Sequence, residues 1–341
     1  MKYLLPKVPR YFKTGLHCHT HISDGTPSPE EMKAFYKAQG YQILSITDHN
    51  VIADHSAMNE EDFLLLTGVE YNISNISATR PWDRWAETYH LNFIAKRPDN
   101  LWQPLLPTRN DAPAKPHLAK IDYQEFPRVY SLENINALIA EANKRGFFVI
   151  YNHPNWCVHS YPDYAGLEGL WGMEMFNNDC LPVTPQDGDN SQIYADLSNL
   201  GKNVMPVAAD DAHGEAKVGG GWVMIGAEKL EYGSVIKAME KGDLYASTGP
   251  EIYELTLEDG KLHIECSDVK SITLESGVRF AGVAKAKSPD EPLREATFDI
   301  AWWLEQCAIK DGHPRNWFRV VVRDADGKYA TTRAYRAKEL M

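Results

Sequence analysis

The feature that most constrains the fold is an alternation of short apolar runs with helix-like segments between about Gly15 and Gly249. The apolar runs cover residues 42–46, 63–66, 146–151, 170–176 and 204–209, and helical spacing occurs in residues 28–39, 131–144 and 190–200. Short buried strands that alternate with helices predict an α/β fold with a parallel sheet, either open or closed into a barrel.

The pattern changes after Pro250, where helical spacing gives way to short strand-like runs. These runs cover residues 252–257, 262–266, 271–274, 296–302, 317–322 and 329–335. Asp-Gly turn sequences follow two of them. The sequence therefore predicts two domains: residues 1–250 form the α/β domain, and residues 251–341 form a small antiparallel β-sandwich.

Charge, hydropathy and cysteine use argue against several classes of protein. The formal net charge is -12, whereas a protein that binds a nucleic acid polymer normally carries a basic surface. No apolar stretch is long enough to cross a bilayer. The five scattered cysteines indicate neither a disulfide framework nor a thiolate zinc site. We expect a cytoplasmic protein that binds neither a membrane nor a nucleic acid polymer, and nothing in the sequence indicates its oligomeric state.

Potential metal ligands recur where the apolar runs of the first domain end. They are His17 and His19, Asp48 and His49, Glu70, His153, and Asp211 with His213. In a parallel sheet or barrel, the C-terminal ends of the strands lie on one rim, and active sites form there. Side chains that are remote in sequence would therefore converge at this rim.

The residue types at these positions suit a catalytic metal site. Imidazole and carboxylate groups without thiolates favour zinc, manganese or iron over calcium or magnesium. Alternate side chains of a strand point to the same face, so His17 and His19 can reach one ion while Cys18 points away. Each residue alone has an ordinary interpretation as a turn cap, an ion-pair partner or a core histidine. Their joint occurrence favours the metal site, with Asp48 orienting His49 or its loop.

Six short motifs carry a family resemblance when they are taken together. They are His17-Cys-His19, Ser-Asp24-Gly, Thr-Asp48-His49, Gly-Val-Glu70, Asn-His153-Pro and Asp211-Ala-His213. This set resembles the motifs of the PHP (polymerase and histidinol phosphatase) superfamily over residues 15–250. The resemblance implies a distorted (β/α)7 barrel that holds two or three divalent ions, Mn, Fe or Zn, at its C-terminal rim.

The resemblance also implies a ligand set for each ion. One ion would be held by His17, His19, Glu70 and Asp211, a second by Glu70, His90 and His153, and a third by Asp24, His49 and His213. His90 departs from the general pattern, because it precedes its apolar run, residues 91–95, instead of following one.

Two later segments are similar to one branch of this superfamily. Residues 242–250 and 317–327 resemble CehA/McbA-like proteins, which append a small β-sandwich to the PHP barrel. That branch includes an aryl carbamate hydrolase, so the resemblance leaves open which bond is cut.

The favoured interpretation is a metal-dependent phosphoesterase that acts on a small phosphomonoester, such as a nucleotide or a sugar or amino-alcohol phosphate. A hydroxide held between the ions would attack phosphorus, with Asp48 and His159 as further catalytic candidates. Arg84 and Lys217 are candidates to hold the phosphate group, and each is equally well explained as a solvated surface charge.

Three other functions are consistent with parts of the sequence. A carbamate, ester or amide hydrolase would use the same metals, with Trp82, Trp85 and Trp156 lining an apolar pocket or simply packing in the core. A non-catalytic, metal-stabilised scaffold would bind a partner through the sandwich. A nuclease or polymerase-associated module is disfavoured by the acidic charge.

Overall fold

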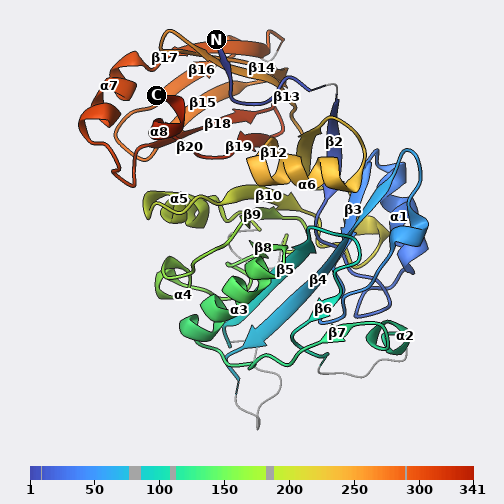
Figure 1. Ribbon diagram of the computed structural model, residues 1–341. Helices are drawn as coiled ribbons and strands as arrows, with labels where there is room; N and C mark the ends of the chain where they lie inside the picture. Colours follow the sequence, from blue (N-terminus) through green and yellow to red (C-terminus); the bar gives the residue numbers. More distant parts are fainter. Residues whose placement is uncertain (9, 77–85, 108–112, 182–187, 289) are drawn as a thin grey trace.

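A long mixed sheet runs through most of the molecule (Figure 1). The computed structural model describes residues 1–8, 10–76, 86–107, 113–181, 188–288 and 290–341. The α/β part contributes, in spatial order, β10 (Met205–Ala209), β9 (Gly172–Asn177), β8 (Phe147–Tyr151), β5 (Thr88–Ala95), β4 (Leu64–Ser74), β3 (Ile43–Ile46), β2 (Arg10–Gly15), β11 (Trp222–Ala227) and β12 (Leu244–Ser247). The mixed α/β architecture expected from the sequence is present.

The direction of the strands determines which ends share an edge. β2, β3 and β4 run parallel, and so do β8, β9 and β10. Between these two groups lies β5, which is antiparallel to both of its neighbours, β4 and β8. The C-terminal ends of the six parallel strands therefore meet the N-terminal end of β5 at one edge. This arrangement explains why His90, at the start of its strand, can join ligands that follow theirs.

The strand path of the α/β part is open in the pairing of the described residues, whereas the sequence predicted a (β/α)7 barrel. No ladder joins β10 to β11 or β2 in these residues. The gap is bridged beyond the strand ends, where the Asp211 N–H donates to the His17 carbonyl (3.1 Å) and the His19 N–H donates to the Ala212 carbonyl (2.9 Å). The segments after the first and last strands of the parallel run are thus joined at the edge that carries the candidate ligands.

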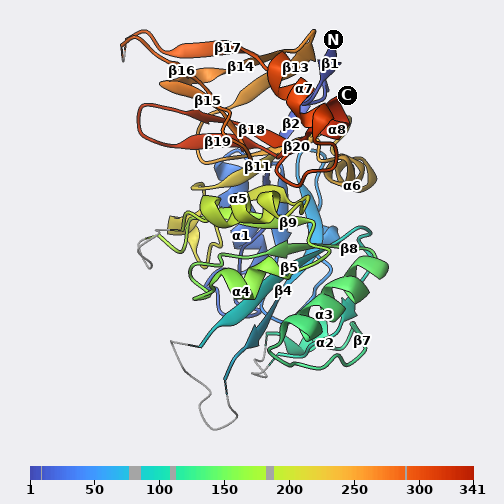
Figure 2. The ribbon, with the colours of Figure 1, turned by 90° about the vertical axis from the view of Figure 1, so that its left-hand side faces the viewer.

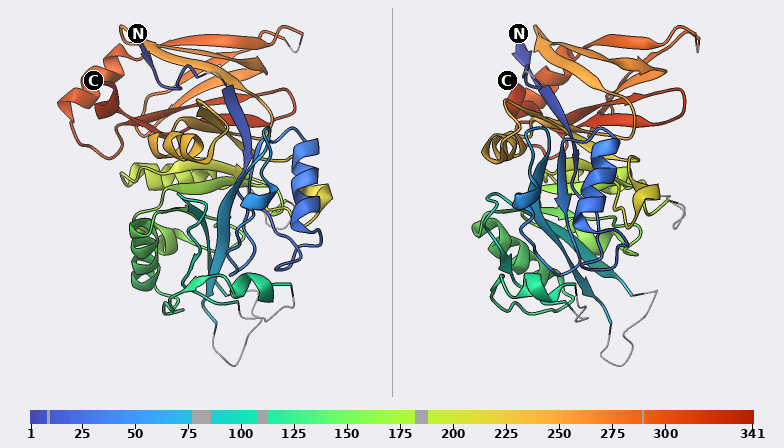
Figure 3. Two further views of the ribbon diagram at one scale, coloured as in Figure 1. Left: turned by 45° about the vertical axis from the view of Figure 1, so that its right-hand side comes forward. Right: turned by 90° about the vertical axis from the view of Figure 1, so that its right-hand side faces the viewer.

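Helices pack along the outside of the α/β part, as Figure 3 shows. α1 (Pro29–Ala38) packs on β3, α3 (Leu132–Lys144) on β8, α5 (Ser191–Asn199) on β9 and α6 (Tyr232–Lys241) on β11. α1 begins with a capping box, in which Ser28 and Glu31 satisfy each other's backbone N–H groups. Each of the three predicted helices lies within one residue of its expected bounds.

Shorter elements lie in the connections between the main strands and helices. They are η1 (Ser56–Met58), β6 (Trp102–Gln103), α2 (Lys115–Leu118), β7 (Asp122–Tyr123), α4 (Tyr161–Ala165) and η2 (Glu215–Lys217). None of these carries a side chain of the predicted metal ligands.

The residues after Pro250 are divided between two sheets, seen above the α/β part in Figure 2. β19 (Tyr329–Thr332), β18 (Trp317–Arg323), β15 (Ser271–Ser276) and β16 (Gly282–Lys285) extend the long sheet from β12, and β20 (Tyr335–Arg336) pairs with β18. β13 (Ile252–Glu258), β14 (Lys261–Val269) and β17 (Leu293–Asp299) form a second sheet with the N-terminal β1 (Lys2–Tyr3). One apolar cluster includes Leu255 and Ile264 from this sheet and Ile272 and Val320 from the long sheet. The predicted boundary at residue 250 is therefore crossed by sheet pairing in both directions.

One of the predicted C-terminal strands extends too far. The strand predicted for residues 296–302 ends at Asp299, and α7 (Ala301–Ile309) follows it. The Asp299 carboxylate accepts a hydrogen bond from the Ala301 N–H (3.0 Å), which satisfies a backbone donor at the start of the helix. A short α8 (Ala337–Leu340) ends the chain.

All five cysteines are buried free thiols. Within the described ranges, no helix combines the length and the hydropathy that a membrane crossing requires.

Candidate metal centre

The predicted ligands gather at the edge where the parallel strands end. His17 and His19 follow β2, His49 follows β3, His153 follows β8, and Asp211 and His213 follow β10. Glu70 lies within β4, which continues beyond it to pair with β5. Between His17 and His19, the Cys18 side chain points away, toward the Ser45 carbonyl.

The innermost group is centred on a carboxylate oxygen of Asp211. Its Oδ1 atom lies 3.0 Å from Nε2 of His17 and 3.0 Å from Nε2 of His19. The two Nε2 atoms lie 3.1 Å apart, and each is 3.4 Å from one oxygen of Glu70. Ligands bonded at about 2.1 Å to one ion lie about 3.0 Å apart in an octahedron and about 3.4 Å apart in a tetrahedron. The separations therefore suit a common transition-metal ion.

Glu70 connects this group to further histidines, because its two carboxylate oxygens face different partners. Oε1 lies 2.9 Å from Nδ1 of His90 and 3.4 Å from Nε2 of His153. Oε2 lies 2.9 Å from Nδ1 of His49. A fully buried carboxylate with this arrangement can bridge two ions.

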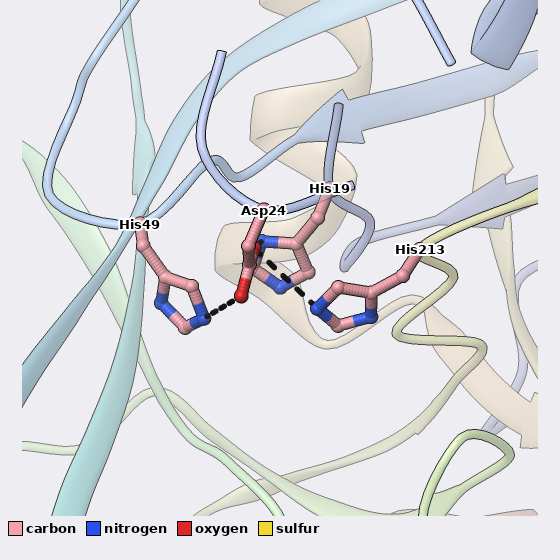
Figure 4. A group of neighbouring side chains, drawn as sticks. All are labelled: His19, Asp24, His49 and His213. Atoms are coloured by element: carbon pink, nitrogen blue, oxygen red, sulfur yellow. Dashed lines mark ion pairs between the residues drawn. The ribbon is translucent and has the colours of Figure 1, made fainter. Parts of the chain in front are cut away.

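A more exposed group surrounds Asp24 (Figure 4). Its Oδ2 atom lies 3.5 Å from Nε2 of His49, and its Oδ1 atom lies 3.5 Å from Nε2 of His213. Nδ1 of His19 lies 3.7 Å from Oδ1 of the same carboxylate. His19 thus presents one ring nitrogen to Asp211 and the other to Asp24.

The buried charges of the cluster shift the pKa values of its imidazole and carboxyl groups. Burial disfavours the charged form of His17, but the carboxylates of Asp211, Glu70 and Glu174 together raise its pKa well above the usual value. Burial likewise opposes ionisation of Asp211 and Glu70, yet the surrounding imidazoles lower the pKa of both carboxyl groups. The acidic groups are thus held ionised and several imidazoles are held protonated, so that protons occupy positions suited to metal ions.

Several buried polar atoms of the cluster make no hydrogen bond. They are Nδ1 of His19, Nδ1 of His49, Oε2 of Glu70 and Oδ1 of Asp211. Two of these atoms, Nδ1 of His49 and Oε2 of Glu70, lie 2.9 Å apart and form an ion pair when the ring is protonated. Buried polar atoms normally form hydrogen bonds, and divalent cations bound in the groups described above would satisfy atoms of this kind. The donor set therefore fits the ions that the sequence predicted.

The comparison with known families bears on the same part of the chain. Residues 15–106 match the PHP domain family. The matched segment contains His17, His19, Asp24, His49, Glu70 and His90, and it supports the PHP superfamily that the motifs indicated.

Individual relatives are more distant or match a short segment. A 62-residue stretch is 42% identical to a 5'-3' exoribonuclease of Haemophilus influenzae, and the alignment spans 17% of this chain and 23% of that protein. A two-domain protein of Bacteroides vulgatus, containing a predicted PHP-like metal-dependent phosphoesterase, has a TM-score of 0.44 at 14% identity, covering 87% of this chain and 88% of that one. PsfC of Pseudomonas syringae has a TM-score of 0.41 at 15% identity, covering 67% and 87%.

The PHP motifs did not predict Glu174, which lies in β9 and is fully buried. Its carboxylate lies 2.6 Å from Nδ1 of His17 and accepts hydrogen bonds from the His153 N–H (3.0 Å) and the Asn177 amide (2.9 Å). The same amide donates to Oδ2 of Asp211 (3.1 Å). The one sequence signal was an acidic residue inside an apolar strand, where an unpaired charge would be costly.

Asp48 supports the candidate metal site through a different segment from the one expected. Its carboxylate accepts hydrogen bonds from the N–H (2.7 Å) and hydroxyl (2.7 Å) of Thr20 and from the hydroxyl of Ser23 (2.8 Å). It therefore fixes the turn that leads into Asp24.

The other site residues that the sequence predicted do not line the described wall of the metal-site cavity. Lys217 forms an ion pair with Asp179 (3.1 Å), and Asp179 lies 3.5 Å from Nδ1 of His213. His159 packs against Tyr89 and lies 2.5 Å from the Tyr151 hydroxyl, and it is not part of the wall of the metal-site cavity. Arg84, Trp82 and Trp85 lie outside the described residues.

A cavity of about 220 Å³ opens over the cluster of candidate ligands. Its described wall consists of seven predicted ligands together with Trp156, Asp179 and Cys180, and it includes no lysine or arginine. A larger cavity of about 580 Å³ lies near the N-terminal ends of β2 and β3, beside Arg10 and Gln42, and none of the candidate ligands lines it.

Proposed function

We propose that this protein is a metal-dependent phosphoesterase that hydrolyses a small phosphomonoester. The observation that carries the proposal is the set of unpaired, buried nitrogen and oxygen atoms that converge around Asp211 and Glu70. The match of residues 15–106 to the PHP domain supports the same class of hydrolase.

The proposal assigns the described side chains to two or three ions of Mn, Fe or Zn. His17, His19, Glu70 and Asp211 would hold the innermost ion, Glu70, His90 and His153 the second, and Asp24, His49 and His213 the third. Bound ions of this kind supply Lewis acidity toward a phosphoryl oxygen and acidify a water molecule. Glu174 and Asp48 would orient these ligands from behind.

The described wall of this cavity offers few side chains that could attack the substrate or bind its phosphate in place of metal ions. Cys180 is the one thiol in the described wall, and burial raises its pKa, which disfavours the nucleophilic thiolate. Because no lysine or arginine lines the described wall, the negative charge of a phosphate would be balanced by the ions. The proposed role of the side chains in this wall is thus to hold the metal ions.

A second candidate is a carbamate, ester or amide hydrolase with the same ligands. It is favoured by Trp156, whose large apolar side chain lines the cavity beside His90 and His153. A third candidate is a metal-stabilised scaffold without turnover.

The test is an assay of protein loaded with Mn, Fe or Zn against small phosphomonoesters, an aryl carbamate and a short RNA. The RNA is included because one relative is named as an exoribonuclease. We expect phosphate release from the monoesters, its loss in Asp211→Ala and its retention in the exposed control Asp99→Ala. Carbamate turnover without phosphate release would favour the second candidate. Equal rates in both variants and the parent would favour contaminating activity or a scaffold.

A further inference from the structure

The segment that follows His153 displays exposed apolar side chains, and one of them, Trp156, lines the metal-site cavity. Trp156, Val158 and Tyr161 are 42%, 50% and 52% exposed. Between them, Cys157 and His159 are buried. An exposed aromatic side chain in the wall of a polar cavity is typical of a surface that contacts a ligand.

The backbone of this segment is held in a fixed conformation. The N–H groups of Cys157 and His159 donate to the carbonyls of His153 and Pro154, each at 3.1 Å. The Asn155 N–H donates to the side chain of Asn190 (3.0 Å). These bonds anchor the exposed side chains to the strand end that carries a proposed metal ligand.

Val158 adopts a conformation that β-branched residues rarely take, with a φ of 61° in the left-handed region. Such strain persists where the surrounding structure imposes it, and it is frequent at functional sites. Glycine would relieve the strain, but it would also remove an apolar side chain from the surface. The strained backbone at Val158 therefore carries an apolar side chain that is exposed to solvent.

The Trp156 ring is positioned by two proposed ligands. Its centroid lies 5.5 Å from that of His90 and 5.1 Å from that of His153, with interplanar angles of 73° and 82°. These edge-to-face contacts fix the ring orientation. The ring is part of the cavity wall, so a group bound over the ions passes directly beside it.

The size and charge of the cavity define what would lie against this ring. A cavity of about 220 Å³ is smaller than the roughly 300–1,000 Å³ that encloses a drug-sized ligand. The organic part of a substrate would extend beyond the ions and past Trp156. Apart from the proposed ligands, the one charged side chain in the described wall is Asp179, which would repel a second anionic group and is already paired with Lys217. An uncharged planar group is therefore the best match.

We propose that Trp156 forms a subsite for an uncharged aromatic leaving group of the substrate. This inference rests on the proposed function, and it narrows the substrate class to aryl esters of phosphate. The aromatic ring of the leaving group would stack on Trp156 while the phosphate lies over the ions.

The experiment measures binding of two stable analogues, phenylphosphonate and methylphosphonate, to metal-loaded protein by calorimetry. They share the phosphonate group and differ in the ring. We expect phenylphosphonate to bind about tenfold more tightly, which corresponds to one good aromatic contact. Trp156→Leu should remove this preference, and Trp156→Phe should retain part of it. The control Trp302→Leu changes a tryptophan that is 58% exposed on α7 and should leave both affinities unchanged.

Metal content measured on each variant shows whether the ions remain in place. Equal binding of both phosphonates, or a parallel loss of both in Trp156→Leu with metal content unchanged, would overturn the subsite and leave the phosphoesterase proposal standing. Failure of the parent protein to bind either phosphonate would contradict the phosphoesterase proposal and the subsite with it. The ratio of kcat/KM for phenyl phosphate to kcat/KM for glycerol phosphate should fall about tenfold in Trp156→Leu, because the intrinsic difference between the two leaving groups is the same in both proteins.

Discussion

Nδ1 of His17 lies 2.6 Å from a carboxylate oxygen of Glu174, and both side chains are fully buried. In the neutral form of His17 that donates its Nδ1 hydrogen to Glu174, Nε2 carries a free lone pair. That lone pair faces the space shared with Oδ1 of Asp211 and Nε2 of His19. A carboxylate behind a histidine in this way fixes the tautomer and raises the basicity of a metal ligand. Glu174 thus prepares His17 to bind a cation.

Replacing Glu174 with glutamine should weaken metal binding while preserving the fold. Glutamine can still accept a hydrogen bond from His17, but it lacks the negative charge that increases the basicity of the ring. We expect about 10- to 100-fold weaker binding of the innermost ion, measured by competition with a chelating dye and by the visible spectrum of the Co²⁺ form. Glu240→Gln, at an exposed ion pair with Lys96, serves as the control. An unchanged affinity and spectrum in Glu174→Gln would contradict this role.

Glu70→Ala and Asp24→Ala should differ in metal stoichiometry. Glu70 contacts histidines of two candidate groups through its two oxygens, whereas Asp24 belongs to one group. Elemental analysis should therefore show the loss of more than one ion per chain in Glu70→Ala and the loss of a single ion in Asp24→Ala. Equal losses in the two variants would refute a bridging role for Glu70.

Metal binding should release protons, and apparent affinity should rise with pH. Burial disfavours protonated His213, but hydrogen bonding to Asp179 and Asp24 raises its pKa to about 11. The pKa of His17 is also raised, so both rings carry a proton at neutral pH in the absence of a cation. Ions bind neutral imidazole, so they must displace these protons, and lower pH favours the protons. Calorimetry in buffers of different ionisation enthalpy should detect about two or more protons released per fully loaded chain; no release would contradict the assignment.

Asp48→Asn should affect the group around Asp24 more than the innermost group. The substitution disrupts hydrogen bonds from Thr20 and Ser23 that fix the turn before Asp24. Hydrogen bonds to a charged acceptor contribute about 1.5–3 kcal/mol each, so we expect roughly tenfold weaker binding of the most exposed ion. Thr20→Val removes a single hydroxyl donor and should have a smaller effect. Weakening of all ions to the same extent would show that Asp48 supports the whole fold instead.

Periodicity predicted the α/β part well because its elements follow local rules. The capping box of α1 and the apolar runs of β8 and β10 are encoded within a few residues. The gathering of His17, Glu70, His153 and Asp211 followed from the expectation that parallel strands end at one edge. These predictions needed no knowledge of which strands pair.

The missed features depend on contacts that are distant in sequence. The reversal of β5 determines that the start of its strand, with His90, reaches the common edge, and periodicity does not report strand direction. Glu174 stands within an apolar run, and its partners His17 and His153 become neighbours only in the folded sheet. The strand predicted for residues 296–302 extended into the first two residues of α7, because Trp302 favours a strand, although the Leu-Glu-Gln sequence that follows favours a helix.

The pairing of β1 with β13 joins the first residues of the chain to a sheet built from residues beyond Pro250. Leu4 and Leu5 also contribute to the apolar cluster that includes Leu255 and Val320. Recombination that exchanged the segment after residue 250 between relatives would separate it from a strand and two core side chains that lie within residues 2–5. Viable chimaeras should therefore exchange both ends of the chain together.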